Sequence, residues 1–202
     1  MGDVKFFPAL HEPAGLYIHL PFCREKCLYC DFVTFPLGRQ AEPYLAAVER
    51  EASTTAARQE PVFGRFDSVY LGGGTPSLLP PAAVARLLDR LRALFTITAD
   101  AEITLESNPE DVTQAAAAAW VAAGVNRVTV GVQTVQADTL TAVRRHGGPA
   151  AVTAAVVALR EAGVGNVALD LIVGLPGEEP THWAESLEFC LGLRPDHVSL
   201  YL

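Results

Sequence analysis

A regular alternation of short apolar segments with longer helix-forming segments runs along most of the chain. Strands are predicted at residues 16–20, 67–71, 102–105, 127–132, 167–173 and 197–201. Helices are predicted between them, at residues 41–58, 81–94, 113–123, 137–145, 150–162 and 181–193. Repeated strand–helix units with short connections produce a parallel sheet, and near-continuous apolar strands indicate burial on both faces. We therefore expect an α/β fold, either an open doubly wound sheet or a barrel.

Local capping signals support several of these helices. Thr113 stands where its hydroxyl can cap the alanine-rich helix that follows. Gly124 and Gly163 stand where a left-handed residue ends a helix. Residues 122–133 and 161–172 share the same order of helix, glycine turn and strand, which indicates a faint internal repeat.

Most of the cysteines lie in one short segment, PFCREKCLYC at residues 21–30. Cys23, Cys27 and Cys30 have the spacing C-x3-C-x2-C. Thiolates are soft ligands suited to zinc or to iron–sulfur iron, and iron–sulfur clusters are usually held by four of them. Three thiolates with no obvious fourth ligand beside them indicate an open metal centre. In a [4Fe–4S] cluster, one iron would then be free to bind a small molecule.

Two other interpretations of the cysteine segment remain. On a helix, positions 23, 27 and 30 would form one buried apolar stripe, although the preceding proline and the charged residues 24–26 disfavour it. A zinc site would need His19 or a more distant histidine as its fourth ligand. Cys190, alone within a helical pattern, is predicted to be a simple buried cysteine.

Chemically unusual residues follow the predicted strands, where functional groups collect in parallel strand–helix folds. The GGGTPS run at 72–77 allows a ligand to approach the backbone closely, although a glycine run alone is equally typical of a plain turn. Glu106 can accept hydrogen bonds from a ligand's amino or hydroxyl group. Gln133 ends the fourth strand, and Arg145 can pair with a carboxylate. Asp170 interrupts an apolar strand, which predicts a ligand or partner because an unpaired buried carboxylate is costly.

The charge balance limits the class of partner. The 202 residues carry 15 basic and 23 acidic side chains, a net charge of −8. This balance disfavours a nucleic-acid interface, because phosphate binding needs clustered Lys and Arg. The N-terminal segment MGDVKFFPALHEPAG has no apolar run of signal-peptide length, and no stretch of the sequence approaches the roughly 18 apolar residues of a membrane span. We expect a cytoplasmic protein without a transmembrane segment, in which clustered cysteines serve a metal.

The cysteine spacing, with an aromatic residue before the last cysteine, resembles the signature of radical S-adenosylmethionine (SAM) proteins. The stretch YIHLPFCREKCLYCDF, residues 17–32, is similar to the oxygen-independent coproporphyrinogen III oxidase family, and within it to the HemW-like haem chaperone branch. The resemblance implies a partial (β/α)6 radical SAM barrel with parallel strands at residues 15–202, after an N-terminal extension at 1–14. The sequence stops after the sixth predicted strand. We therefore expect a fragment or a truncated product, without the rest of the barrel and a C-terminal domain.

The resemblance also implies the cofactors. It assigns a [4Fe–4S] cluster to Cys23, Cys27 and Cys30, with SAM as the exchangeable ligand of the open iron. One-electron reduction of SAM then gives a 5′-deoxyadenosyl radical that abstracts hydrogen from a substrate. The resemblance also implies which residues contact SAM: Tyr17, Tyr29, Gly73, Gly74, Thr75, Glu106, Gln133, Arg145 and Asp170. Arg144 is the alternative to Arg145 in this set.

The chain departs from the oxidases at two points. They carry a further cysteine where this chain has Phe32, and a longer N-terminal extension. These departures favour the chaperone, which binds haem and transfers it to an acceptor protein. The alternatives are oxidative decarboxylation of coproporphyrinogen III in porphyrin biosynthesis, another radical SAM activity, or a metal-binding module without SAM. If the haem site lies in the absent C-terminal part, this chain alone does not bind haem. No spacing singles out a haem ligand among His11, His19, His146, His182 and His197.

Overall fold

The computed structural model describes residues 14–59 and 64–202. Its six main strands form one parallel sheet in which each strand pairs with the next along the chain, in the order β1–β4–β5–β6–β7–β8. Their bounds are, in that order, Ala14–Leu20, Phe66–Gly73, Ile97–Ser107, Arg127–Gln133, Asn166–Ile172 and His197–Tyr201. The six predicted strands are confirmed. His11 and nearly all of the expected N-terminal extension lie outside the described residues.

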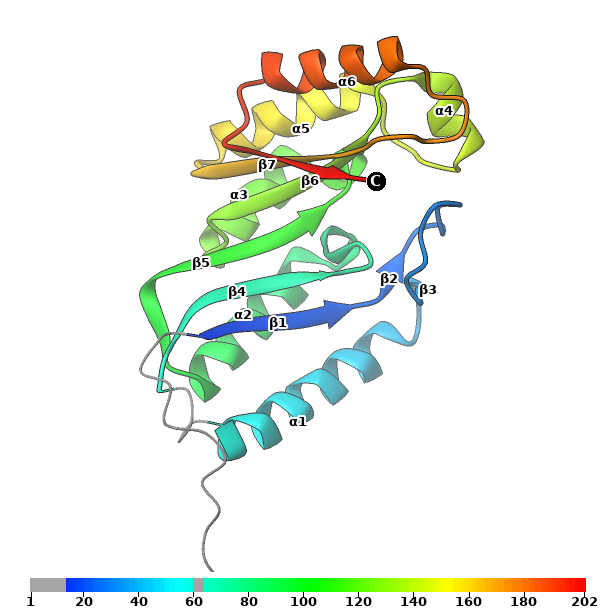
Figure 1. Cartoon of the computed structure of the whole chain (residues 1–202). Coiled ribbons are helices and arrows are strands. Elements are labelled where there is room, and N and C mark those ends of the chain that lie inside the picture. Colours follow the sequence, from blue (N-terminus) through cyan, green and yellow to red (C-terminus); the bar gives the residue numbers. More distant parts are fainter. Residues whose placement is uncertain (1–13, 60–63) are drawn as a thin grey trace, which may run out of the picture.

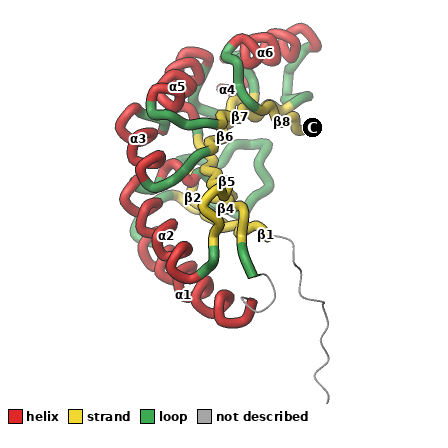
Figure 2. The backbone as a smooth tube through the Cα atoms, turned by 90° about the vertical axis from the view of Figure 1, so that its left-hand side faces the viewer, coloured by secondary structure: helices red, strands yellow, loops and turns green. Residues whose placement is uncertain are grey.

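The helices that connect these strands lie along one face of a curved sheet (Figures 1 and 2). A doubly wound sheet has helices on both faces, so this arrangement is a partial barrel with the helices outside. The helices are α1 (Ala41–Gln59), α2 (Pro81–Leu94), α3 (Gln114–Ala122), α4 (Ala137–Ala142), α5 (Pro149–Glu161) and α6 (Pro180–Gly192). Two 3-10 turns, η1 (Pro76–Leu78) and η2 (Pro109–Asp111), follow β4 and β5.

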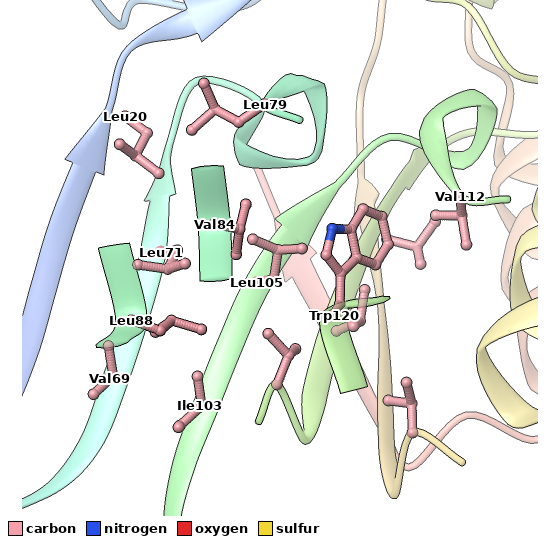
Figure 3. Packing of buried hydrophobic residues seen from close by; sticks show 14 of the residues in the cluster. Leu20, Val69, Leu71, Leu79, Val84, Leu88, Ile103, Leu105, Val112 and Trp120 are labelled. Carbon is pink, nitrogen blue, oxygen red and sulfur yellow. The ribbon is translucent and has the colours of Figure 1, made fainter. Parts of the chain in front are cut away.

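The hydrophobic core fills the space between the sheet and these helices (Figure 3). Leu71 on β4 and Leu105 on β5 are completely buried, and Val84 and Leu88 belong to the same cluster from α2. Trp120 on α3 is also completely buried. Burial of one such large apolar side chain contributes about 1.5–3 kcal/mol. These side chains belong to one cluster, which packs α2 and α3 against the sheet.

The capping signals of the sequence are confirmed. The Thr113 hydroxyl accepts a hydrogen bond from the Ala116 N–H at the start of α3. Gly124 and Gly163 have φ values of 94° and 90°, the left-handed conformation that ends α3 and α5. Cys190 is completely buried, and burial raises the pKa of its thiol to about 11.

Two predicted boundaries are wrong. The helix expected to reach residue 145 ends at Ala142, because Arg144 takes a left-handed φ of 57° and turns the chain. Strand β5 begins at Ile97, well before the expected residue 102, because Ile97 pairs with Phe66 across a register irregularity. No apolar run marks these first residues of β5, so the sequence pattern does not reveal them.

The cysteine segment forms a loop, so the interpretation as a helical cysteine stripe is wrong. It begins in a two-residue strand β2 (Phe22–Cys23), which pairs with β3 (Phe35–Pro36). The residues between these strands contain no helix. We call residues 23–34 the cysteine loop. Within the described part of the chain, no helix is long and apolar enough to cross a membrane.

Candidate cofactor site

A cleft of about 600 Å³ lies at the carboxyl ends of the parallel strands, beneath the cysteine loop. This volume is in the range of small-molecule sites, about 300–1,000 Å³. The cleft is lined by the cysteine loop, the end of β4, the ends of β5 to β8 and residues 144–146. The sequence-predicted residues that share this lining are Cys23, Cys27, Tyr29, Cys30, Gly73, Gly74, Thr75, Glu106, Gln133, Arg144, Arg145 and Asp170. Tyr17 is not among the lining residues.

The three thiols of the cysteine loop are free and partly buried. The Thr75 hydroxyl donates to Sγ of Cys23 at 3.6 Å, and the Cys27 thiol donates to the carbonyl of Arg144 at 3.7 Å. Cys30 donates its backbone N–H to the carbonyl of Cys27 at 3.1 Å. Burial raises the pKa of Cys23, partly offset by the Thr75 hydrogen bond. Two of the thiols therefore contact different segments of the cleft wall, the turn after β4 and the turn after α4.

The thiols fit an iron–sulfur cluster better than a single zinc ion. In residues 14–59 and 64–202, no three His, Cys, Asp or Glu side chains are grouped closely enough to hold one ion. A cluster distributes its thiolate ligands over separate iron atoms, so its sulfur ligands need not converge on one point. His19, the proposed fourth zinc ligand, has its Nδ1 3.0 Å from the Tyr17 hydroxyl.

The glycine run packs against the protein itself. A Cβ on Gly73 would lie 2.5 Å from the ring of His19, and one on Gly74 would lie 2.6 Å from the Phe22 carbonyl oxygen. The Gly74 N–H donates to the Leu20 carbonyl at 2.9 Å. The glycines thus allow the end of β4 to contact residues 19–22, directly before the cysteine loop. Their contact with a ligand stays a prediction.

Glu106 is oriented by two donors at the end of β5. Its Oε1 accepts from the Tyr70 hydroxyl at 2.7 Å, and its Oε2 accepts from the Gly73 N–H at 3.0 Å. A carboxylate has about four lone-pair sites, so both oxygens can still accept from a ligand. Tyr17 stacks on Tyr70 with ring centroids 6.0 Å apart and is 57% exposed. The Tyr70 ring therefore lies between Tyr17 and Glu106, and Tyr17 does not line the cleft.

Tyr29 lies on the cysteine-loop side of the cleft. Burial raises the pKa of its hydroxyl, and nearby Cys27 raises it further, whereas the positive charge of Arg145 lowers it. The hydroxyl therefore stays protonated at neutral pH, with Cys27 as its side-chain hydrogen-bond partner.

The geometry distinguishes the two candidate arginines. The Arg145 guanidinium donates to the carbonyl of Gly131 on the cleft wall, and its Nε is buried without a hydrogen-bond partner. Arg144 is exposed and contributes its backbone carbonyl to Cys27. Gln133 lies beside Gly131 with a positive φ of 69°, at the register shift between β6 and β7. Arg145 is therefore better placed than Arg144 to bind an anionic group in the cleft.

Asp170 is a half-buried carboxylate on β7. Burial raises the pKa of this carboxyl and the charge of Glu106 raises it further, whereas a hydrogen bond from Ser199 lowers it. Buried polar atoms normally have partners, yet several on the cleft-lining residues have none. These atoms are Oδ1 of Asp170, Nε of Arg145, Oγ1 of Thr129 and Oε2 of Glu110. Such atoms fit a polar ligand with both donors and acceptors.

Sequence reasoning missed part of this lining. On β6, Thr129 and Gly131 line the cleft together with Gln133, and alternate residues of a strand share one face. Counting back from Gln133 in steps of two residues identifies Gly131 and Thr129 from the sequence. Glu110 carries no sequence signal, because only the fold brings its carboxylate against Gly147.

Residues 17–190 match the radical SAM superfamily, so the chain belongs to this superfamily. Membership implies a [4Fe–4S] cluster and SAM as cofactors.

Several relatives of this chain are named heme chaperones. The chain is 37% identical over 198 residues to the heme chaperone HemW of Mycobacterium tuberculosis, covering 96% of this chain and 50% of that protein. It is 35% identical over 192 residues to HemW of Escherichia coli, covering 94% and 50%. The structure of the coproporphyrinogen III oxidase HemN from Escherichia coli, a radical SAM enzyme, has a TM-score of 0.85 at 32% identity and covers 94% of this chain and 44% of that one. The chain thus spans about half the length of the curated relatives it matches.

Proposed function

We propose that this chain holds a [4Fe–4S] cluster and SAM as the cofactor-binding part of a haem chaperone. The observation that carries the proposal is the shared cleft. Cys23, Cys27 and Cys30 line the same cavity as Arg145 and Asp170, whose buried polar atoms lack partners.

The cleft residues divide by chemistry into metal ligands and ligands of SAM. The three thiolates would hold the cluster, and the fourth position would stay open for SAM. Arg145 would donate to a carboxylate, whereas Glu106 and Asp170 would accept from amino and hydroxyl groups. When bound, the cluster and SAM supply one-electron reductive chemistry. The cysteine loop over the cleft would limit access of water to them.

The chaperone is favoured over the oxidase by the residue two positions after the third cysteine and by the relatives. Phe32 occupies the position of the oxidases' additional cysteine, and its ring is 59% exposed at the cleft. HemW proteins match the chain at 35–37% identity. Binding of haem and its transfer to an acceptor protein are proposals for the whole protein. Decarboxylation of coproporphyrinogen III remains the second candidate, because the HemN structure has the same fold.

Anaerobic reconstitution tests the cofactor assignment. We expect the reduced parent protein to show the electron paramagnetic resonance signal of a [4Fe–4S]+ cluster, which changes when SAM is added. Cys27→Ala should lose the cluster without loss of fold, and Cys190→Ala is the matched control, because Cys190 is buried in α6 away from the cleft. Tightly bound zinc in the parent, or full iron and sulfide in Cys27→Ala, would contradict the proposal. Haem titration and an assay with coproporphyrinogen III then separate chaperone from oxidase.

A further inference from the structure

The cysteine loop is tied to the turn after β5 by an ion pair. Arg24, directly after Cys23, donates from its guanidinium to Oδ1 of Asp111 at 2.7 Å. The Asp111 side chain is only 5% exposed, whereas that of Arg24 is 57% exposed. The pair therefore joins a long, exposed side chain of the loop to a carboxylate that is buried within the fold.

The second oxygen of this carboxylate continues the connection. Oδ2 of Asp111 accepts from the Ser77 hydroxyl at 3.0 Å, and the same Ser77 oxygen accepts from the Asn108 N–H at 3.3 Å. Ser77 lies in η1, after the glycine run, and Asp111 lies in η2. One carboxylate thus connects the cysteine loop to the turns that follow two neighbouring strands.

The backbone also ties the loop to its surroundings, because the Leu28 N–H donates to the Val143 carbonyl at 3.0 Å. The other side-chain contacts of the loop are longer, more exposed or internal. His146 and Glu25 are 3.4 Å apart, and both side chains are about half exposed. Exposed pairs of this kind contribute little. Lys26 donates to the carbonyl of Phe32 within the loop itself. The Asp111 contact is therefore the one that combines a short distance with a buried acceptor among these side-chain contacts.

We propose that Asp111 is a positioning residue, which holds the cysteine loop over the cleft through Arg24 before any cofactor binds. Asp111 is not among the cleft-lining residues, so it acts on the ligands of the cluster and not on SAM or a substrate. Residues behind the first ligands orient metal sites in this way. The inference rests on the proposed function only for the identity of the cofactor.

Hydrogen–deuterium exchange of the cofactor-free protein tests the positioning directly. In Arg24→Gln and Asp111→Asn, the amides of residues 24–33 should exchange about three- to tenfold faster, because a charge-assisted hydrogen bond of a partly exposed pair is lost. Arg24→Lys, which keeps the charge, should restore part of the protection. Arg86→Gln is the matched control, because Arg86 pairs with Glu42 at 3.0 Å on the outer surface of α2.

A second readout concerns the cluster. We expect Arg24→Gln and Asp111→Asn to lose the cluster to a chelator about three- to tenfold faster than the parent. Both should also show an altered electron paramagnetic resonance signal in the presence of SAM. Unchanged loop exchange in both variants, or equal acceleration in Arg86→Gln, would overturn the proposal. If the parent holds no cluster, the proposed function fails, whereas the exchange measurement still decides whether Asp111 positions the loop.

Discussion

Replacing Gly74 with alanine tests how closely the glycine run packs against Pro21 and Phe22, directly before the cysteine loop. The new Cβ would lie 2.6 Å from the Phe22 carbonyl oxygen, 2.7 Å from the Phe22 nitrogen and 2.8 Å from the Pro21 carbonyl carbon. These are backbone atoms, and the segment is held by hydrogen bonds from Gly74 to Leu20 and from Thr75 to Phe22, at 2.9 and 2.7 Å. None can move aside as the end of a flexible side chain would. The methyl group must therefore separate the end of β4 from Pro21 and Phe22.

The expected cost follows from these contacts. Forcing an extra methyl group into a packed site costs about 1–3 kcal/mol, and loss of one of the two backbone hydrogen bonds adds about 0.5–1.5 kcal/mol. Restriction of the unfolded chain by alanine offsets about 0.4–1 kcal/mol. We expect the free energy of unfolding to fall by about 0.5–4 kcal/mol, with Tm falling by about 2–4 °C for each kcal/mol.

Urea unfolding followed by tryptophan fluorescence measures this change. Gly165→Ala is the matched control, because its nearest neighbour would be the Asn126 carbonyl oxygen at 3.9 Å, an ordinary contact. The Gly74→Ala protein should also bind less cluster, because the displaced segment carries Cys23. Equal unfolding midpoints for the two variants would refute the reasoning.

Two further predictions concern the polar groups of the cleft. Burial raises the pKa of Asp170 above its ordinary 3.8, so the folded chain holds this proton more tightly than the unfolded chain, and its ionisation costs stability as the pH rises through the raised pKa. Asp170→Asn should therefore be more stable than the parent at neutral pH, with a difference that shrinks as urea unfolding is repeated toward pH 3.8; a constant difference would contradict this. Arg145→Ala should weaken SAM binding about tenfold or more in calorimetry of the reconstituted protein, whereas Arg144→Ala should leave it nearly unchanged, and the opposite order would show that Arg144 is the ligand.

The sequence alone determined the parallel sheet and the position of its functional edge. Strand–helix alternation with apolar strands is a local pattern, and a parallel sheet is what that pattern can bury. The carboxyl ends of the strands then share one edge, so Glu106, Gln133 and Asp170 were predicted to lie near the cysteines, and they line one cleft. The Thr113 cap likewise depends on residues within one helical turn.

The tertiary structure decided what depends on contacts between distant segments. Arg145 differs from Arg144 in two ways that depend on the fold. Arg144 has a left-handed backbone conformation, and the Arg145 guanidinium donates to the carbonyl of Gly131 on β6. Asp111 meets Arg24 across 87 positions of sequence, and no local pattern marks such a pair. The demand for glycine at position 74 comes from Pro21 and Phe22, whose backbone atoms pack against it, and not from any turn of its own. These features follow from strand order and register, which place loops side by side only after the whole sheet has formed.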